Sequence, residues 1–338
     1  MTVQKSSYSS LLAIVGVLFI IWNILGIMDS KNYTYSGYST DDNFTINRVE
    51  EGSPAENAGL QIGDVLKSTG GIAVSDSKAL NKRQRAMIGE TREYVVDRGG
   101  EEVTTQLTFS ERTDKEKNLN RVGDLMGLLF IIIGLFANYK FKSELSFAFA
   151  VFAVSFGFIF SGGAYISSPA LGSIVGVLRT AVVLFALTSL AIYMLKYPPV
   201  SSFMSSKNYK MIFLPMILLL VIISILEIMQ PDRTGTLNMV MRLLFGFFIV
   251  FYFGLSVVTL LRKYMRSSSA DRNSKGLTMM LIGTLVGVLP ILLYFFIGII
   301  SPSADLPGND YMFLTFMAIP IFFYLALNQL HNSVATAD

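Results

Sequence analysis

The chain has 338 residues, of which 52% are hydrophobic and only 15% are charged, with a net charge of +3 and a mean hydropathy of +0.53. Soluble globular proteins carry about 25% charged residues, and several apolar runs here exceed the roughly 18 residues that mark a transmembrane helix. This composition excludes a soluble enzyme, a disordered chain and a nucleic-acid binder, and the absence of cysteine excludes disulfides, thiolate metal sites and a cysteine nucleophile.

Eight apolar runs are predicted to span a membrane, because each can cross about 30 Å of hydrocarbon at about 1.5 Å per residue. They cover approximately residues 10–28, 122–139, 145–162, 170–195, 211–230, 238–261, 277–300 and 311–330. The first is predicted to be an uncleaved anchor, since its apolar stretch is longer than the roughly 7–15 residues of a signal peptide. In the fourth, Gly172 and Gly176 have the G-x-x-x-G spacing that permits close helix contact.

Lysine and arginine alternate between rich and poor connections, which predicts the orientation. The basic connections are the N-terminal tail, residues 140–144, 196–210 and 262–276, whereas the short connections 161–169, 230–236 and 301–310 contain Arg233 alone. Both termini are therefore predicted to be cytoplasmic and residues 29–121 to be outside. The basic cluster 262–275 is interpreted as a topology signal, with a lipid headgroup site as the alternative.

Residues 29–121 differ from the rest, with dense charge and short alternating apolar runs that predict half-buried strands. We predict a strand at 44–49, a turn and short helix at 52–60 capped by Ser53, strands from residues 63 and 72, and a second helix over 75–87. The alternation of 91–97 and 101–109 about Arg98-Gly99-Gly100 predicts a β-hairpin.

Four short motifs of this segment, in their order along the chain, resemble those of a bacterial PDZ domain. They are Gly52-Ser53-Pro54-Ala55, Ala58-Gly59-Leu60, Gly63-Asp64 and Asp97–Glu101. The resemblance implies a small β-barrel with two helices that binds an extended peptide as an added strand, beside a loop whose backbone N–H groups hold the terminal carboxylate. An empty or self-filled groove is the alternative. The residues that would form the peptide site are Ser36, Gly37, Tyr38, Ser39 and Thr40, with Ala79, Leu80 and Arg83 of the second helix.

The membrane part contains no catalytic constellation. A zinc protease needs H-E-x-x-H on a helix and a serine protease needs a histidine base, but the single histidine, His331, follows the last predicted span. We therefore predict a non-enzymatic protein with no catalytic residue, no metal ligand and no cofactor.

Three ionisable residues are predicted in the outer half of the membrane part: Arg179, Glu227 and Arg242. Charges inside a membrane usually indicate a ligand or transport site; a structural Arg–Glu pair that offsets burial is the alternative. Two cations and one anion leave a positive excess, which suits a ligand with a carboxylate and an apolar body.

The layout, a first span, an external PDZ-like insert and seven further spans, resembles the sensor region of ComP-type quorum-sensing histidine kinases, without the kinase part. The similarity extends to the end of the last span, Ala318–Leu327. It implies a secreted peptide ligand and a cytoplasmic kinase or regulator as partner.

We predict a polytopic α-helical protein of the bacterial cytoplasmic membrane with about eight transmembrane helices and an extracytoplasmic α+β domain inserted after the first. The predicted boundaries are 1–29 for the tail and first helix, 30–113 for the PDZ-like domain, 114–331 for the seven-helix bundle and 332–338 for a cytoplasmic tail. The predicted function is a membrane sensor. A membrane-anchored scaffold that recruits C-terminal tails of envelope proteins is the alternative, and a transporter is third because no internal repeat is visible.

Overall fold

The computed structural model describes residues 8–205, 207–229, 236–300 and 309–335. Within these ranges seven helices are long and apolar enough to cross a membrane. The apolar helices are α1 (Ser9–Asp29), α4 (Asp114–Phe141), α5 (Glu144–Ile159), α6 (Pro169–Lys196), α8 (Leu214–Met229, preceded by the 3₁₀ segment η2, Lys207–Phe213), α9 (Thr236–Arg266), α11 (Leu277–Ile300) and α12 (Ala318–Ala335, preceded by η3, Asn309–Met317). Each predicted span coincides with an apolar helix, but the 16 residues of α5 extend only about 24 Å at 1.5 Å per residue. By length, the described residues therefore contain seven candidate spans and not eight.

The helical part packs around two hydrophobic clusters. Phe149, Phe152, Tyr193 and Phe323 belong to one, between α4, α5, α6, α11 and α12. The other lies between α6, α8 and α9. Many remaining apolar side chains on these helices are exposed, as expected for helices that face lipid.

A close helix contact lies between α4 and α5, at Gly127 and Gly157. A Cβ added to Gly127 would lie 2.5 Å from the Gly157 carbonyl oxygen, and one added to Gly157 would lie 2.6 Å from the Gly127 carbonyl oxygen. No side chain fits this crossing, as in other small-residue contacts in membranes. Gly172 and Gly176, whose spacing would permit such a contact, do not make one with the described residues, because none of these lies within 4 Å of a Cβ at either position.

The segment between α1 and α4 forms a small α+β domain with three short sheets. Its strands are β1 (Thr34–Tyr35), β2 (Tyr38–Thr40), β3 (Ile46–Val49), β4 (Val65–Thr69), β5 (Ile72–Ala73), β6 (Thr91–Arg98), β7 (Glu101–Thr108) and β8 (Ser110–Glu111). The antiparallel sheets have the orders β1-β8, β2-β3 and β5-β4-β6-β7, and a bridge between Thr45 and Val65 joins the second to the third.

The predicted hairpin is confirmed: β6 and β7 pair from Thr91↔Thr108 to Arg98↔Glu101. Gly99 and Gly100 both have positive φ, which a two-residue hairpin turn of the favoured type requires. The side chains that alternate inward from these strands pack on α2 (Pro54–Asn57) in a core that includes Ile46, Ala55 and Val96.

Of the two helices in the domain, α2 begins where it was predicted to begin, and the second helix is shorter than predicted. Ser53 caps α2 by accepting a hydrogen bond from Glu56 N, as predicted. The second helix, α3 (Ser77–Lys82), is much shorter than the predicted 75–87. It ends because Arg83 adopts extended backbone, with its guanidinium donating to the Thr69 carbonyl oxygen at 2.5 Å.

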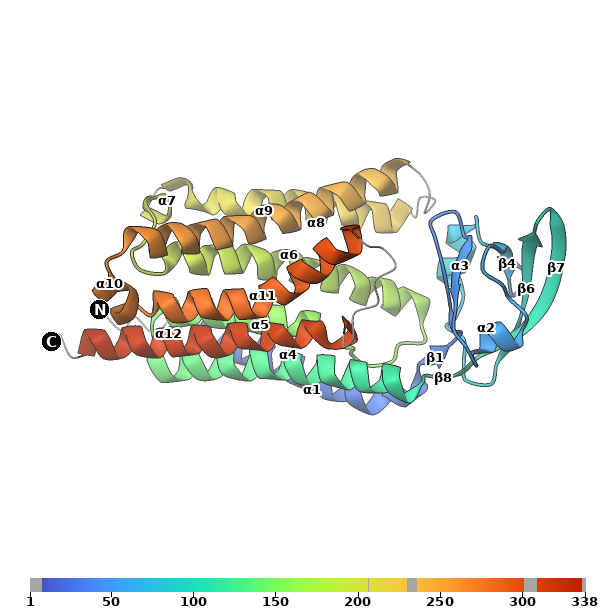
Figure 1. Ribbon diagram of the computed structural model, residues 1–338, viewed down its shortest axis with the longest axis horizontal. Coiled ribbons are helices and arrows are strands. Elements are labelled where there is room, and N and C mark those ends of the chain that lie inside the picture. Colours follow the sequence, from blue (N-terminus) through green and yellow to red (C-terminus); the bar gives the residue numbers. More distant parts are fainter. Residues whose placement is uncertain (1–7, 206, 230–235, 301–308, 336–338) are drawn as a thin grey trace.

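The domain lies at one end of the helical part, and α1 begins and α12 ends at the other (Figure 1). The chain leaves α1 and enters α4 through neighbouring strands, since Thr34 pairs with Glu111 and Tyr35 with Ser110. The two connections between the domain and the helices therefore lie side by side. We call the end of the helical bundle that carries the domain the domain end.

Candidate functional site

The loop that was predicted to hold a peptide carboxylate connects β1 to β2. The Ser36 carbonyl oxygen accepts from Ala55 N (2.9 Å) and the Gly37 carbonyl oxygen from Glu50 N (2.8 Å). Among the described residues no acceptor is assigned to the N–H groups of Ser36 and Gly37. Gly37 has φ +78°, and a Cβ there would lie 2.1 Å from Ser53 Cβ. The loop thus has the backbone turn and free donors that a carboxylate site needs.

The strand after this loop has one free edge. β2 pairs with β3 through Tyr38↔Val49 and Thr40↔Ile46, and in the described part of the chain it has no other partner strand. Ser39 is exposed and its hydroxyl donates to Asn47 Oδ1 (2.7 Å). Backbone groups along the free edge of a strand are available to pair with an added strand.

The side chain of Tyr38 supports this edge from inside the domain. Its ring packs edge-on against Tyr94, with centroids 5.9 Å apart, and burial raises the pKa of its hydroxyl. Tyr38 therefore belongs to the hydrophobic core as well as to the predicted peptide strand.

The residues predicted from the second helix separate in the structure. Leu80 packs against the core of the domain and Ala79 is half-buried. Arg83 lies beyond the end of α3, close enough to interact electrostatically with Tyr38, and burial lowers the pKa of its guanidinium. Leu80 thus contributes to the core of the domain, whereas Arg83 places a positive charge near Tyr38 of β2.

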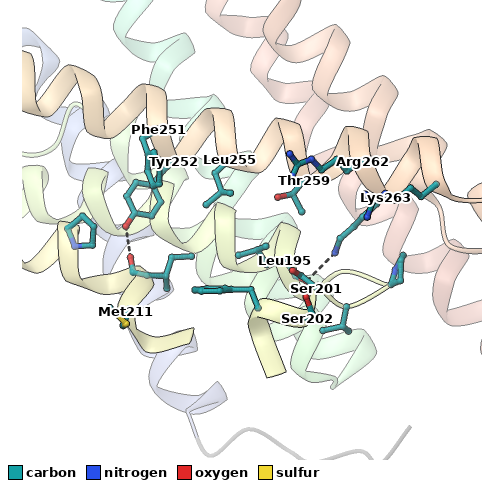
Figure 2. Close-up of a pocket in the computed structure, with 16 residues that line it drawn as sticks. Leu195, Ser201, Ser202, Met211, Phe251, Tyr252, Leu255, Thr259, Arg262 and Lys263 are labelled. Atoms are coloured by element: carbon teal, nitrogen blue, oxygen red, sulfur yellow. Dashed lines mark hydrogen bonds between the residues drawn. The ribbon is translucent and has the colours of Figure 1, made fainter. Parts of the chain in front are cut away.

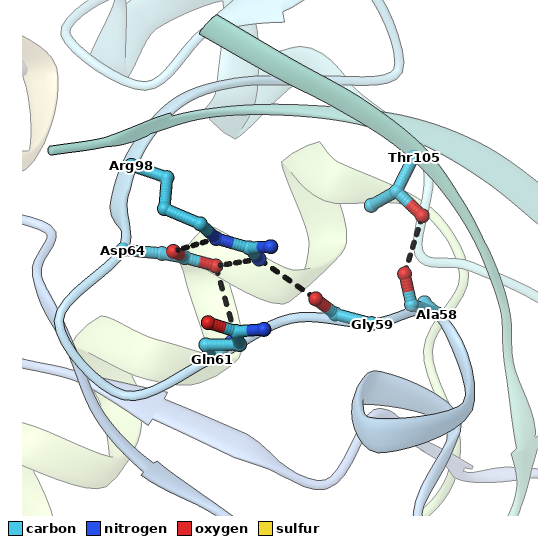
Figure 3. A network of polar contacts seen from close by, with 6 residues as sticks. All are labelled: Ala58, Gly59, Gln61, Asp64, Arg98 and Thr105. Atoms are coloured by element: carbon cyan, nitrogen blue, oxygen red, sulfur yellow. Dashed lines mark hydrogen bonds and ion pairs between the residues drawn. The ribbon is translucent and has the colours of Figure 1, made fainter. Parts of the chain in front are cut away.

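An ion pair between a buried carboxylate and a partly exposed arginine lies beside α2 in the domain. Asp64 is 1% exposed and accepts from Arg98 Nε and Nη2, both at 2.8 Å, and from Gln61 N at 2.8 Å (Figure 3). Arg98 Nη2 also donates to the Gly59 carbonyl oxygen at 2.7 Å. These bonds from Arg98 hold the pKa of Asp64 below its ordinary value.

Polar contacts attach the domain to the helical part at several points. The Tyr33 hydroxyl donates to the carbonyl oxygens of Gly163 (3.3 Å) and Ala164 (3.4 Å), in the loop between α5 and α6. At the end of α1, where the chain enters the domain, Asp29 Oδ2 accepts from Tyr165 N in the same loop (3.1 Å). The domain is therefore fastened to the bundle and not merely tethered by its two connections.

Of the three charges predicted to lie in the membrane, the two whose side chains the structure describes, Arg179 and Arg242, line different cavities. Arg242 of α9 pairs with Asp42 of the β2–β3 turn at 2.7 Å, and the side chain of Glu227 lies outside the described residues. Arg179 Nη2 donates to the carbonyl oxygens of Ser161 (3.0 Å) and Gly162. A turn of the domain that is distant in sequence therefore supplies the partner of Arg242, and the predicted grouping with Glu227 stays a prediction.

Arg179 lines a cavity of about 320 Å³ between the domain and the domain end of the helices, which we call the junction cavity. Its other charged lining residues are Arg85, Arg112 and Asp124, and Gly172 and Gly176 form part of its wall. Sequence reasoning missed Asp124, although a carboxylate within the predicted span 122–139 met the same criterion that selected Arg179.

Asp124 is 2% exposed and has polar neighbours inside the bundle. It accepts from Gly162 N at 2.8 Å. With the amide nitrogen of the buried Asn23 oriented toward it, Asn23 donates to Asp124 Oδ1 at 2.9 Å. Asp124 thus joins α1, α4 and the loop before α6, which offsets the cost of burying its carboxyl group.

A second cavity, of about 690 Å³, lies at the end of the bundle away from the domain (Figure 2). Its wall is mainly apolar, with Arg262, Lys263 and Arg266. Lys263 Nζ donates to the carbonyl oxygens of Met194 (2.7 Å), Leu195 (3.1 Å) and Tyr197. Since the last carbonyls of a helix lack intrahelical partners, Lys263 acts as a cap for α6.

Among the described residues, no group of three or more histidine, aspartate or glutamate side chains is placed to hold a metal ion. The profile of the PDZ domain family matches residues 45–95. No curated protein matches the chain. The chain thus contains a PDZ domain, a protein-interaction module, next to helices that could span a membrane. The match begins after Ser36–Thr40, so the peptide site itself is still a prediction, as is the resemblance of the whole layout to quorum-sensing sensor regions.

Proposed function

We propose that the protein is a non-enzymatic membrane sensor whose PDZ domain lies outside the cytoplasm and binds the C-terminus of an extended peptide. The peptide would add to the free edge of β2, with its carboxylate against the N–H groups of Ser36 and Gly37. Because PDZ domains typically bind in this way, the unpaired edge and donors support this assignment of the groove.

The sensor proposal depends on the polar contacts between the domain and the helices. Tyr33 reaches the α5–α6 loop through hydrogen bonds, and Asp42 reaches α9 through an ion pair. A ligand can shift a conformational equilibrium only if it interacts differently with the two states. Contacts that extend from the β2–β3 turn to α9 provide a physical route by which occupancy of β2 can affect the bundle. The cytoplasmic kinase or regulator that would receive the signal is part of the proposal.

The experiment is hydrogen exchange on the full protein with a pool of peptides that have free C-termini. A bound peptide should slow exchange at Tyr38–Thr40, and the same peptide with an amidated C-terminus should bind more weakly. The sensor proposal further expects a change in α6 or α9 that Asp42→Asn reduces without weakening peptide binding. The matched control is Asp41→Asn on the same turn, which leaves the Asp42–Arg242 pair intact.

The alternative function is a membrane-anchored scaffold, which the free β2 edge favours equally. A scaffold should bind peptide at β2 with no change in any helix, in the parent and in Asp42→Asn alike. If no peptide from a broad pool slows exchange at β2, peptide binding is refuted for both functions.

The proposed orientation has a separate test, because the chain has no cysteine. Lys78 in α3 and Ala270 in α10 (Ser269–Ser274) are both exposed. An impermeant maleimide added to intact cells should label Lys78→Cys and not Ala270→Cys. Labelling of Ala270→Cys from outside would reverse the orientation.

A further inference from the structure

The junction cavity has a strong excess of positive charge. Arg85 comes from the segment after α3, Arg112 from the connection between β8 and α4, and Arg179 from α6. Asp124 is the one acidic residue among the lining residues. Three cations against one carboxyl group leave an excess of at least two positive charges, in a place enclosed by the domain and three helices.

These cations retain unused hydrogen-bond donors. Arg85 and Arg112 both lie over the Tyr33 ring, with guanidinium carbons 5.8 Å and 4.5 Å from its centroid. Stacking of this kind fixes a guanidinium while leaving its N–H groups at the edge available. Among the described residues neither arginine has an ion pair, which distinguishes both from Arg242.

Two buried donors at the cavity also lack an acceptor among the residues that the structure describes. Arg179 uses Nη2 for the Ser161 and Gly162 carbonyl oxygens, but its Nε is buried without a partner. The indole nitrogen of Trp22 in α1, another lining residue, is buried without a partner too. Buried polar groups are normally satisfied, so two such donors in one cationic cavity indicate an acceptor that the protein itself does not supply.

We propose that the junction cavity binds a phosphate group. Arginine forks match the oxygens of phosphate, and a doubly charged phosphate balances the excess of two. A carboxylate would leave one charge uncompensated. The volume of about 320 Å³ lies at the lower end of the range for small-molecule sites, about 300–1,000 Å³. The site is separate from the β2 groove, so this inference does not rest on peptide binding.

The structure provides its own probe for this site, because Trp22 is the single tryptophan of the chain. The full protein is purified in a maltoside detergent, which carries no phosphate. Sodium phosphate is then titrated against sodium chloride at matched ionic strength while tryptophan emission is recorded. A second titration compares phosphatidic acid with diacylglycerol of the same acyl chains, since the phosphate could be that of a lipid headgroup.

A saturable change with sodium phosphate supports a soluble ligand, and a change with phosphatidic acid but not with diacylglycerol or sodium phosphate supports a lipid headgroup. Arg179→Gln should weaken the response about tenfold or more, because it removes a charged donor from the cavity. Arg262→Gln, at the other end of the bundle, is the matched control and should respond like the parent.

If Arg179→Gln fails to fold, as judged by circular dichroism and gel filtration, the double variant Arg85→Gln/Arg112→Gln replaces it. Both of these residues lie outside the candidate spans. The absence of a saturable change in both titrations overturns the proposal. It is also overturned if the folded cavity variant responds as strongly as Arg262→Gln.

Discussion

Replacing Asp64 by asparagine should destabilise the PDZ domain strongly. The carboxylate is 1% exposed and accepts two hydrogen bonds from Arg98 and one from Gln61 N. Asparagine has nearly the same shape, but its amide N–H groups would face the guanidinium, and Arg98 would lose its counter-charge. Because the Arg98 side chain is 32% exposed, the loss is smaller than for a fully buried pair. We expect about 1–3 kcal/mol, which corresponds to a factor of about 10 to 10² in the opening equilibrium.

Hydrogen exchange on the full protein measures this directly at β6. Arg98, the partner of Asp64, is the last residue of β6, and Val65, next to Asp64, pairs with Asp97 of the same strand. Amides of β6 should exchange faster by that factor in Asp64→Asn. The control is Arg48→Gln, which breaks the Arg48–Glu50 pair, whose side chains are 67% and 37% exposed, and should cost about 0–1 kcal/mol. If Asp64→Asn speeds exchange no more than Arg48→Gln, the Asp64–Arg98 pair does not stabilise the domain as argued.

Three further outcomes are expected. Arg98 lowers the pKa of Asp64 in the folded domain, so the ionised carboxylate contributes fully to stability above the unfolded pKa of about 4, and this contribution is lost as the pH falls through the folded pKa. The difference in unfolding free energy between the parent and Asp64→Asn should therefore shrink below about pH 4. A difference that stays constant with pH would contradict this. Gly37→Ala should cost about 1–3 kcal/mol, clearly more than Gly52→Ala, since both have positive φ but only Gly37 would bring a Cβ onto Ser53; equal losses in urea titrations would contradict the steric argument. Gly127→Ala should lower the thermal midpoint of the detergent-solubilised protein, because overpacking costs about 1–3 kcal/mol. Gly254→Ala should not lower it, because a Cβ at Gly254 has open space around it. Equal midpoints of the two variants would contradict the close α4–α5 crossing.

The elements that local sequence specifies were predicted well. The turn Gly99-Gly100 and the alternation on either side of it are sufficient to define the β6–β7 hairpin. Ser53 and Pro54 define the start of α2. The second helix was overestimated because its end depends on Arg83 reaching the Thr69 carbonyl oxygen, a contact between segments that local propensity does not describe.

The candidate sites show the same division. The Ser36–Thr40 strand could be suggested from its place before the PDZ-like words, and the structure adds its free edge and its support by Tyr94. The junction cavity could not be predicted, because Arg85 and Arg112 meet Arg179 only when the domain sits on the helices. Asp42 likewise gave no signal of its pairing with Arg242, 200 positions away.

The sequence by itself determined the class of the protein: apolar runs long enough to cross a membrane, with a PDZ domain between the first two. These properties follow from composition, hydrophobic period and turn residues, which act over a few positions of the chain. The tertiary structure alone decided which charges meet. Arg242 is neutralised by Asp42, whereas Arg179 shares a cavity with two further arginines, because electrostatic pairing depends on distances in space that residue spacing along separate helices and loops does not set.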